Sequence, residues 1–365
     1  PEDCRAYFGD GYSTIQSKLP DPAMGLTLGW IKPIGGIFDR RVVLSSSIYL
    51  PTWDIIRVQG LDSRTPHFML YEDLSEKLSI VGSVSYRPFS WLSLGVGAQL
   101  LTDVGASVAL EVDSANKRFT QQDTFVELEP NMGVLAGVSI RPLDGLTLGA
   151  AFREELPLEF TLPADVRLGK VFQMDLYVDG TVLFSPHQFD FGAAYLWESL
   201  DLELSVQTTL SLWSRMKDMT PRIDLDVGGE MINGLGLDNV FDLREPGPRP
   251  RLGLSNTWNL HSGFDWGLSR VFRFRAGYQY RPSPVPGQEG SSNLLDNTAH
   301  GLSTGFAVHL GADDEFKEAP VEIGVGVIFL LLERRTVYKQ DGDQVGSLSH
   351  GGNVVGGNLS IAHRY

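Results

Sequence analysis

The segment from Phe272 to Arg281 constrains the fold most strongly, because apolar and polar residues alternate in it without interruption. The apolar positions are Phe272, Phe274, Ala276, Tyr278 and Tyr280, and the intervening positions include Arg273, Arg275 and Arg281. A period of two residues predicts a β-strand whose two faces meet different surroundings. In a soluble sandwich the apolar face packs inward, whereas in a membrane barrel it contacts lipid and the polar face lines a wet lumen. The rest of the chain has to decide between these two folds.

The same alternation recurs along the whole chain and predicts thirteen β-strands, while helical periodicity is scarce. The predicted strands span residues 22–33, 39–51, 76–88, 91–112, 125–141, 144–162, 176–197, 199–216, 250–266, 270–281, 299–311, 319–336 and 350–365. The longest apolar run, 325–332, has the length of a strand and falls short of the ~20 residues that a membrane-spanning helix needs. The chain is therefore predicted to be all-β.

The connections between these strands alternate in length. Short ones are predicted near residues 34–38, 89–90, 142–145, 197–199, 267–269 and 312–318, and longer ones near 52–75, 113–124, 163–175, 217–249, 282–298 and 337–349. Greek-key sandwiches disrupt such an order, whereas an up-and-down meander with its tight turns at one end is typical of an outer-membrane barrel. We predict one domain over residues 1–365, an antiparallel up-and-down transmembrane β-barrel from residue 22 onward, with 1–21 as a loop or residual N-terminal segment.

Aromatic residues agree with this interpretation. Trp30, Trp91, Trp197 and Trp266 all fall within a few residues of the predicted short turns. Tryptophan favours the membrane–water interface, where its ring lies in an apolar layer and its N–H meets water. The alternative is a set of core tryptophans in a soluble protein. The last residue, Tyr365, ends the final predicted strand on an aromatic side chain, as outer-membrane barrels commonly do.

Composition and isolated motifs exclude several functions. The formal net charge of −15 repels nucleic acid, and no basic patch offsets it. Cys4 is the only cysteine, and the seven histidines show no metal-ligand spacing, so neither a metal nor another cofactor is predicted. Gly301–Gly305 fits the Gly-x-Ser-x-Gly form around Ser303, but that motif needs a strand, a sharp turn and a helix. Because the alternation continues to Leu310, we predict that the protein is not an enzyme.

Six segments, which form three groups, resemble the FadL family of outer-membrane transporters for hydrophobic compounds. They are Tyr280–Gln288 with Leu295–Asn297 and Leu302–Gly305, then Leu78–Gly97, and Asn131–Phe160 with Phe184–Ser214. The resemblance runs from about residue 20 to the end. It implies a fourteen-stranded barrel in the bacterial outer membrane, plugged by an N-terminal hatch, that binds long-chain fatty acids or other hydrophobic molecules and releases them sideways through a kinked strand.

The chain departs from this family pattern in three places. Residues 22–33 resemble the family's second strand, so the hatch and first strand are expected upstream of Pro1. Residues 113–124 are short and polar where the family has a long helical third outer loop. Residues 42–51, which match the kinked strand, carry three serines and no glycine. The sequence therefore does not decide whether substrate is released sideways through the barrel wall.

Two groups of residues are candidates for substrate binding. Residues along each strand alternate between the lipid face and the lumen face, and this alternation places Arg153, Arg273 and Arg275 in the lumen. A guanidinium there could bind a fatty-acid carboxylate at two points. The alternative is a salt-bridge network that holds the wall or a plug. The second group, which continues apolar faces beyond the membrane boundary, consists of Leu156, Leu158 and Phe160 with Phe68 and Tyr71. Such exposed apolar surface often marks a binding site, although ordinary loop packing explains it equally well.

The sequence thus predicts a channel in the bacterial outer membrane that takes up hydrophobic small molecules, such as long-chain fatty acids, by passive diffusion. Its partners are the substrate and the outer-membrane lipid, with no nucleic acid. The alternative is a barrel that transports nothing and scaffolds an outer-membrane assembly, with protein partners bound through extracellular loops such as the acidic segment 217–249. A lipid hydrolase using Ser303 is a weaker third hypothesis.

Overall fold

The computed structural model describes residues 6–8, 11–13, 24–35, 39–51, 66–68, 78–113, 118–168, 171–218, 222–235, 252–288, 293–310, 321–339 and 346–363. Within these ranges no helix is both long enough and apolar enough to cross a membrane. Cys4, Tyr71 and Tyr365 lie outside the described residues, as does most of the segment 217–249.

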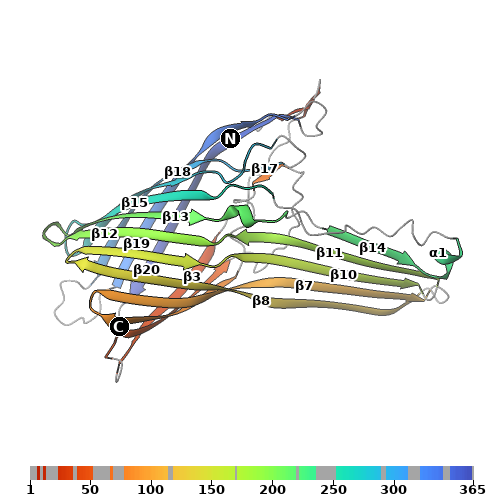
Figure 1. Cartoon of the computed structure of the whole chain (residues 1–365), viewed down its shortest axis with the longest axis horizontal. Helices are drawn as coiled ribbons and strands as arrows, with labels where there is room; N and C mark the ends of the chain where they lie inside the picture. Colours follow the sequence, from red (N-terminus) through yellow and green to blue (C-terminus); the bar gives the residue numbers. More distant parts are fainter. Residues whose placement is uncertain are drawn as a thin grey trace.

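Thirteen strands follow one another around a single curled sheet, which we call the barrel wall (Figure 1). In order they are β3 (Gly25–Ile34), β4 (Val42–Pro51), β6 (Ser79–Phe89), β7 (Leu92–Asp113), β8 (Arg118–Leu143), β9 (Leu146–Arg153), β12 (Gln188–Trp197), β13 (Leu202–Ser211), β15 (Thr257–Gly267), β16 (Phe272–Arg281), β18 (Ala299–Leu310), β19 (Val321–Val337) and β20 (Leu348–His363). Every neighbouring pair is antiparallel. The predicted up-and-down meander is confirmed.

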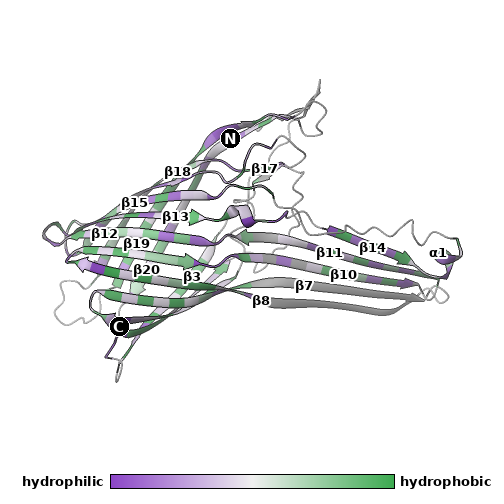
Figure 2. Cartoon of the chain, in the orientation of Figure 1, coloured by the Kyte–Doolittle hydropathy of each residue, from purple (hydrophilic) through white to green (hydrophobic). Residues whose placement is uncertain are grey.

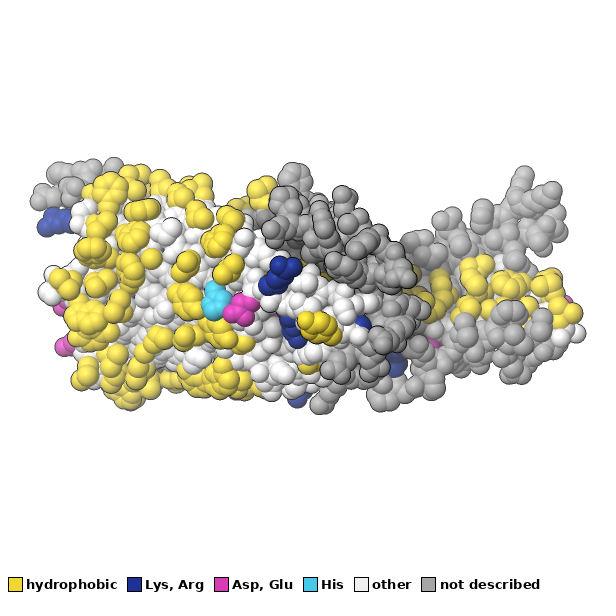
Figure 3. All heavy atoms as spheres, turned by 90° about the horizontal axis from the view of Figure 1, so that it is seen from above, with side chains coloured by type: hydrophobic (Ala, Val, Ile, Leu, Met, Phe, Trp, Pro, Cys, Tyr) yellow, Lys and Arg dark blue, Asp and Glu magenta, His cyan; other side chains and the backbone are white. Residues whose placement is uncertain are grey.

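The two faces of the wall carry opposite chemistry, as the alternation predicts. Outward side chains are large and apolar, and Phe272, Leu302 and Phe306 are 52%, 61% and 57% exposed. Figure 2 shows hydrophobic and hydrophilic residues alternating along the strands, and Figure 3 shows hydrophobic side chains spread over the outer surface of the wall. Trp30, Trp91, Trp197 and Trp266 are also exposed. A soluble sandwich would bury these faces, so the outward apolar surface suits lipid.

Beyond the wall, a second sheet region extends outward, and we call it the arm (Figure 1). It consists of residues 102–113 of β7 and 118–130 of β8, joined by β10 (Leu156–Leu168), β11 (Phe172–Ser185), β14 (Arg222–Gly228) and the short helix α1 (Glu230–Gly234). β10 pairs with β7 in parallel, β11 pairs with β10 antiparallel, and β14 pairs with β11 antiparallel. The arm is therefore continuous with the wall through β7 and β8.

The arm corrects the predicted strand boundaries. The predicted strand 144–162 is divided between β9 and β10 at Glu154–Glu155, and the predicted strand 176–197 is divided between β11 and β12 at Pro186–His187. The predicted loop 113–124 is largely strand, because β7 and β8 stay paired up to Asp113 and Arg118. These outer strands carry many polar residues, since they lie beyond the apolar surface of the wall.

The chain reaches the arm by crossing β8 on its lumen side. Met132 and Val134 point outward and are exposed, whereas Gly133 between them is buried. A Cβ atom added at Gly133 would lie only 2.8 Å from Cγ of Leu156, the first residue of β10. Leu156 is itself only 1% exposed. Position 133 is therefore a close approach between two strands, and a glycine is required there.

Smaller elements lie at the ends of the wall. β1 (Ala6–Phe8) pairs with β2 (Gly11–Ser13), and β5 (His67–Phe68) pairs in parallel with β17 (Leu294–Leu295). Two 3-10 turns, η2 (Glu198–Leu200) and η3 (Trp213–Arg215), flank β13. Within the described residues β3 pairs only with β4, and β20 pairs only with β19. The expected strand upstream of Pro1 stays a prediction.

Candidate functional site

A cavity of about 620 Å³ lies where the strands of the wall meet their long connections, and we call it the mouth cavity. Its walls are the outer ends of most strands between β4 and β19. The lining includes Tyr49, Ser79, Gln99, Leu101, Gln188, Ser211, Thr257, Asn259, Gln279, Arg281, Ala299 and Leu330. These residues come from strands around the whole wall, so the cavity belongs to the lumen and not to the outer surface.

One side of the mouth cavity is apolar. Phe184 at the end of β11, Trp213 in η3 and Pro284 in the connection after β16 all line it. The rings of Phe184 and Trp213 lie with their centroids 6.3 Å apart. Behind them pack Met216, Leu252, Leu254, Val285 and Leu294. Three connections of the chain thus build an apolar cover over a lumen that is otherwise largely polar.

The connection between β16 and β18 is fastened by two arginines. Nη2 of Arg281 donates to Oδ1 of Asp296 at 3.1 Å, and Asp296 is completely buried. The guanidinium of Arg335 donates to Oγ of Ser283 at 3.2 Å and to the carbonyl of Pro286 at 2.6 Å. Burial raises the pKa of Asp296, against the pull of the Arg281 guanidinium. These contacts hold residues 282–288 and 293–298 in place above the cavity.

Asn297 anchors the same connection to the last two strands. Its Nδ2 donates to the carbonyl of Glu333 at 2.7 Å and to the carbonyl of His350 at 3.2 Å. Nδ1 of His350 hydrogen-bonds to Oδ1 of Asn297 at 2.9 Å. Asn297 is fully buried, so all of these bonds lie away from solvent. The cover is therefore rigidly attached to β19 and β20.

A second fastening holds the crossing into the arm. Arg215 donates through Nε and Nη2 to the two carboxylate oxygens of Glu155, at 2.6 and 3.0 Å. Nε2 of His187 lies 3.4 Å from the same carboxylate. The hydrogen bond from Arg215 lowers the pKa of Glu155. This cluster ties η3, the start of β10 and the start of β12 together beside the mouth cavity.

The described members of the predicted apolar group belong to two different parts of the structure. Leu156 is buried against Gly133, and Leu158 and Phe160 belong to β10 in the arm. Phe68 packs elsewhere, against Leu295, Val337 and Leu348, with its ring 5.7 Å from that of His350. Tyr71 lies outside the described residues. Their role in binding substrate stays a prediction.

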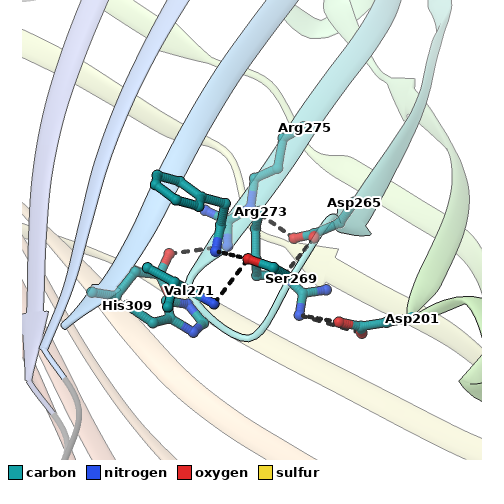
Figure 4. A network of polar contacts seen from close by, with 9 residues as sticks. Asp201, Asp265, Ser269, Val271, Arg273, Arg275 and His309 are labelled. Atoms are coloured by element: carbon teal, nitrogen blue, oxygen red, sulfur yellow. Dashed lines mark hydrogen bonds and ion pairs between the residues drawn. The ribbon is translucent and has the colours of Figure 1, made fainter. Parts of the chain in front are cut away.

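The other predicted group, the lumen arginines, is divided between two places. Arg273 and Arg275 lie in an ionic network near the short turns, which we call the floor network (Figure 4). Its members are Asp201, Asp265, Arg273, Arg275, His309 and Glu322. Asp265 accepts from Nε of both arginines at 2.7 Å, and Nη2 of Arg275 reaches Glu322 at 3.0 Å. Both guanidiniums are therefore engaged by carboxylates of the protein.

Arg153 is placed differently. It is exposed at the outer end of β9, beside Gln188 of the mouth cavity in the sheet register. Among the described residues it has no hydrogen-bonded or ionic partner. The binding of a substrate carboxylate by any of these three arginines stays a prediction. No group of three or more possible metal ligands is found in the described part of the chain.

Sequence reasoning did not single out the residues that line the mouth cavity. Ser211, Asn259 and Arg281 occupy lumen-facing positions at the outer ends of their strands, next to long connections. The sequence of each strand shows both features separately, namely the alternation that directs a residue to the lumen and the long connection that follows it. The apolar cover could not be predicted from the sequence, because Phe184, Trp213 and Leu294 come together only when three separate connections fold.

The chain matches no protein-family model and no curated protein sequence. Among solved structures it is similar to the P. putida toluene transporter TodX, with 12% identity over 100% of this chain and 88% of that chain and a TM-score of 0.52. A deltaS2S3 mutant of TodX, described as a monoaromatic hydrocarbon channel, gives 12% identity over 98% and 86% of the two chains and a TM-score of 0.51. At this identity the likeness establishes the fold, which is that of these barrel channels.

Proposed function

We propose that this protein is an outer-membrane channel of the FadL type, which takes up hydrophobic small molecules by passive diffusion. The observation that carries the proposal is the inversion of the wall, whose outer face is apolar and whose inner face is polar around a cavity with an apolar cover. A lipid bilayer explains the first face, and a path for solutes explains the second. The shared fold with TodX and the motifs that resemble the FadL family support it.

The lumen leaves space for a solute below the mouth cavity. Ser303, Gly305, Gly324 and Gly326 line a further cavity of about 520 Å³ on the inner faces of β18 and β19. Ser303 lies in the middle of β18, where it pairs with Gly277 and Ile328. The turn and helix that a hydrolase nucleophile requires are not formed there, so Ser303 serves as a small lumen residue.

Two substrate classes fit this proposal, small aromatic molecules and long-chain fatty acids. TodX is a toluene transporter, which favours the first class for that protein, and a cavity of about 620 Å³ is within the range of small-molecule sites. The test is uptake of labelled toluene and labelled oleate by a Gram-negative host that lacks its own channels of this type and expresses the complete protein. Initial rates above those of cells with an empty vector are expected for at least one substrate. Uptake of both substrates at no more than the empty-vector rate would refute transport.

A scaffold that transports nothing is the second candidate, and the arm is the observation that favours it. Within β10, β11 and β14, Leu162, Val178 and Ile223 lie side by side on one face. The hydrophobic side chains near the tip of the arm are visible in Figure 3. If the scaffold hypothesis holds, other proteins co-purify with the complete chain, deletion of the arm releases them, and uptake stays at the empty-vector rate.

A further inference from the structure

We propose that the mouth cavity recognises a neutral hydrogen-bonding group on its substrate, so that the channel prefers phenol-like aromatic molecules to plain hydrocarbons of the same size. This inference rests on the proposed channel function and adds a substrate class to it. The observation behind it is a pair of buried side-chain oxygen atoms in the cavity wall that have no hydrogen-bond partner within the described residues.

The first of these side chains is Ser211 at the outer end of β13. It lines the mouth cavity and is only 1% exposed, and its Oγ makes no hydrogen bond. Oδ1 of Asn259 on β15 lines the same cavity and is likewise buried without a partner. A buried polar atom that is left unpaired costs about 1–3 kcal/mol. Two such atoms in one cavity wall indicate a ligand that pairs with them.

The sheet register brings these two groups together. Ser211 is paired with Thr257, and Thr209 with Asn259, so Ser211 and Asn259 are diagonal neighbours on the lumen face. Thr209 already donates to Oδ1 of Asp190, and Gln207 donates to the same carboxylate at 3.0 Å. These polar groups farther down the wall are therefore satisfied by each other, while Oγ of Ser211 and Oδ1 of Asn259 have no hydrogen-bond partner.

The chemistry of the pair favours a neutral hydroxyl. Oδ1 of Asn259 only accepts a hydrogen bond, whereas the Ser211 hydroxyl both donates and accepts. A phenol hydroxyl can donate to Asn259 and accept from Ser211, and it also fits if the amide of Asn259 is turned over. A methyl group in its place satisfies neither residue. In the same cavity, Phe184 and Trp213 supply the apolar surface that an aromatic ring needs.

A carboxylate fits the cavity less well than a hydroxyl. Arg281 is the one cationic residue among the described residues that line the cavity, and its guanidinium is paired with the buried Asp296. An anion that left water for this cavity would meet no free cation among the described residues of its lining, which is costly. The ligand class assigned here is therefore an uncharged aromatic molecule with one hydroxyl group, such as a cresol.

The test compares p-cresol with toluene, which differ by one hydroxyl group. A Gram-negative host without its own channels of this type expresses the complete protein, and initial uptake of each labelled compound is measured against an empty vector. The variants are Ser211→Ala and Asn259→Leu. The control is Ser205→Ala, the same substitution on the same strand, outside the mouth cavity. Outer-membrane amounts and heat-modifiable migration on gels show that each variant is folded.

The wild type is expected to take up p-cresol faster than toluene. Ser211→Ala should lower the ratio of p-cresol to toluene uptake about 3- to 10-fold, as the loss of one hydrogen bond implies. Asn259→Leu should lower it by at least as much, and Ser205→Ala should leave it unchanged. Equal ratios in the wild type and both cavity variants would overturn the inference, because water then satisfies the two groups. Uptake of neither compound above the empty-vector rate would instead refute the channel function itself.

Discussion

The crossing of β10 over β8 can be tested through the contact between Gly133 and Leu156. Substituting Gly133→Ala adds a Cβ atom 2.8 Å from Cγ of Leu156 and 3.1 and 3.2 Å from its two Cδ atoms. Leu156 cannot move aside, because it is 1% exposed and the carbonyl of Pro157 next to it accepts a hydrogen bond from Asn131. Overpacking of this kind costs about 1–3 kcal/mol of unfolding free energy.

The partner substitution Leu156→Ala tests whether this contact is the cause. Alone it leaves a cavity and costs about 2–5 kcal/mol. In the double variant the three atoms that clash with the new Cβ are gone, so Gly133→Ala should cost almost nothing further. The double-variant cycle is therefore expected to give a coupling free energy of about 1–3 kcal/mol in favour of the pair.

The assay is urea unfolding in detergent micelles, followed by tryptophan fluorescence. The matched control is Gly137→Ala, which lies four residues farther along the same face of β8. Its added Cβ would meet its nearest atom, the carbonyl oxygen of Ala150, at an ordinary 3.5 Å. Gly137→Ala should therefore be much milder than Gly133→Ala. If the Gly133 and Leu156 substitutions prove additive, or if both glycine variants lose equal stability, then β10 does not cross β8 at this point.

Three further variants test the fastenings of the mouth, the arm and the floor. Arg335→Met removes the guanidinium that holds the connection after β16; because it breaks at least two charge-assisted hydrogen bonds, local stability should fall by about 2–3 kcal/mol and limited proteolysis within 282–298 should become faster. In the arm, the hydrogen bond that protonated Asp165 donates to the Asp175 carboxylate raises the pKa of Asp165, so the pair is stabilised at low pH and loses that contribution as pH rises through the raised value. Asp165→Asn should remove this pH dependence in hydrogen exchange of β10. Asp265→Asn removes the negative charge that Nε of Arg273 and Nε of Arg275 both contact at 2.7 Å and leaves one amide oxygen as acceptor; because these groups are partly exposed, the free energy of unfolding in urea should fall by about 1 kcal/mol.

The alternation of apolar and polar residues along each strand was enough to predict the strands of the wall and the face that each presents outward. The alternation from Phe272 to Arg281 fixes which side chains share a face, and the tight turns fix which strands are neighbours, so thirteen antiparallel strands and their outward apolar face follow from local rules. The arm breaks this rule. After Arg153 the chain leaves the β8 edge that it has followed and pairs with β7 instead, in parallel, and no local pattern in residues 144–162 marks that change of partner.

The lumen arginines show the same limit at the level of single residues. Parity correctly places Arg273 and Arg275 in the lumen, but it cannot identify the carboxylates that meet them from β13, β15 and β19. Because Asp201, Asp265 and Glu322 already engage both guanidiniums, an anionic substrate would have to compete with fixed partners at the floor. The buried unpaired atoms that line the mouth cavity itself, Oγ of Ser211 and Oδ1 of Asn259, are neutral. A substrate that carries its polarity as a hydroxyl therefore meets open hydrogen-bonding capacity in the lining of the mouth cavity, whereas a carboxylate at the floor meets cations that are already occupied.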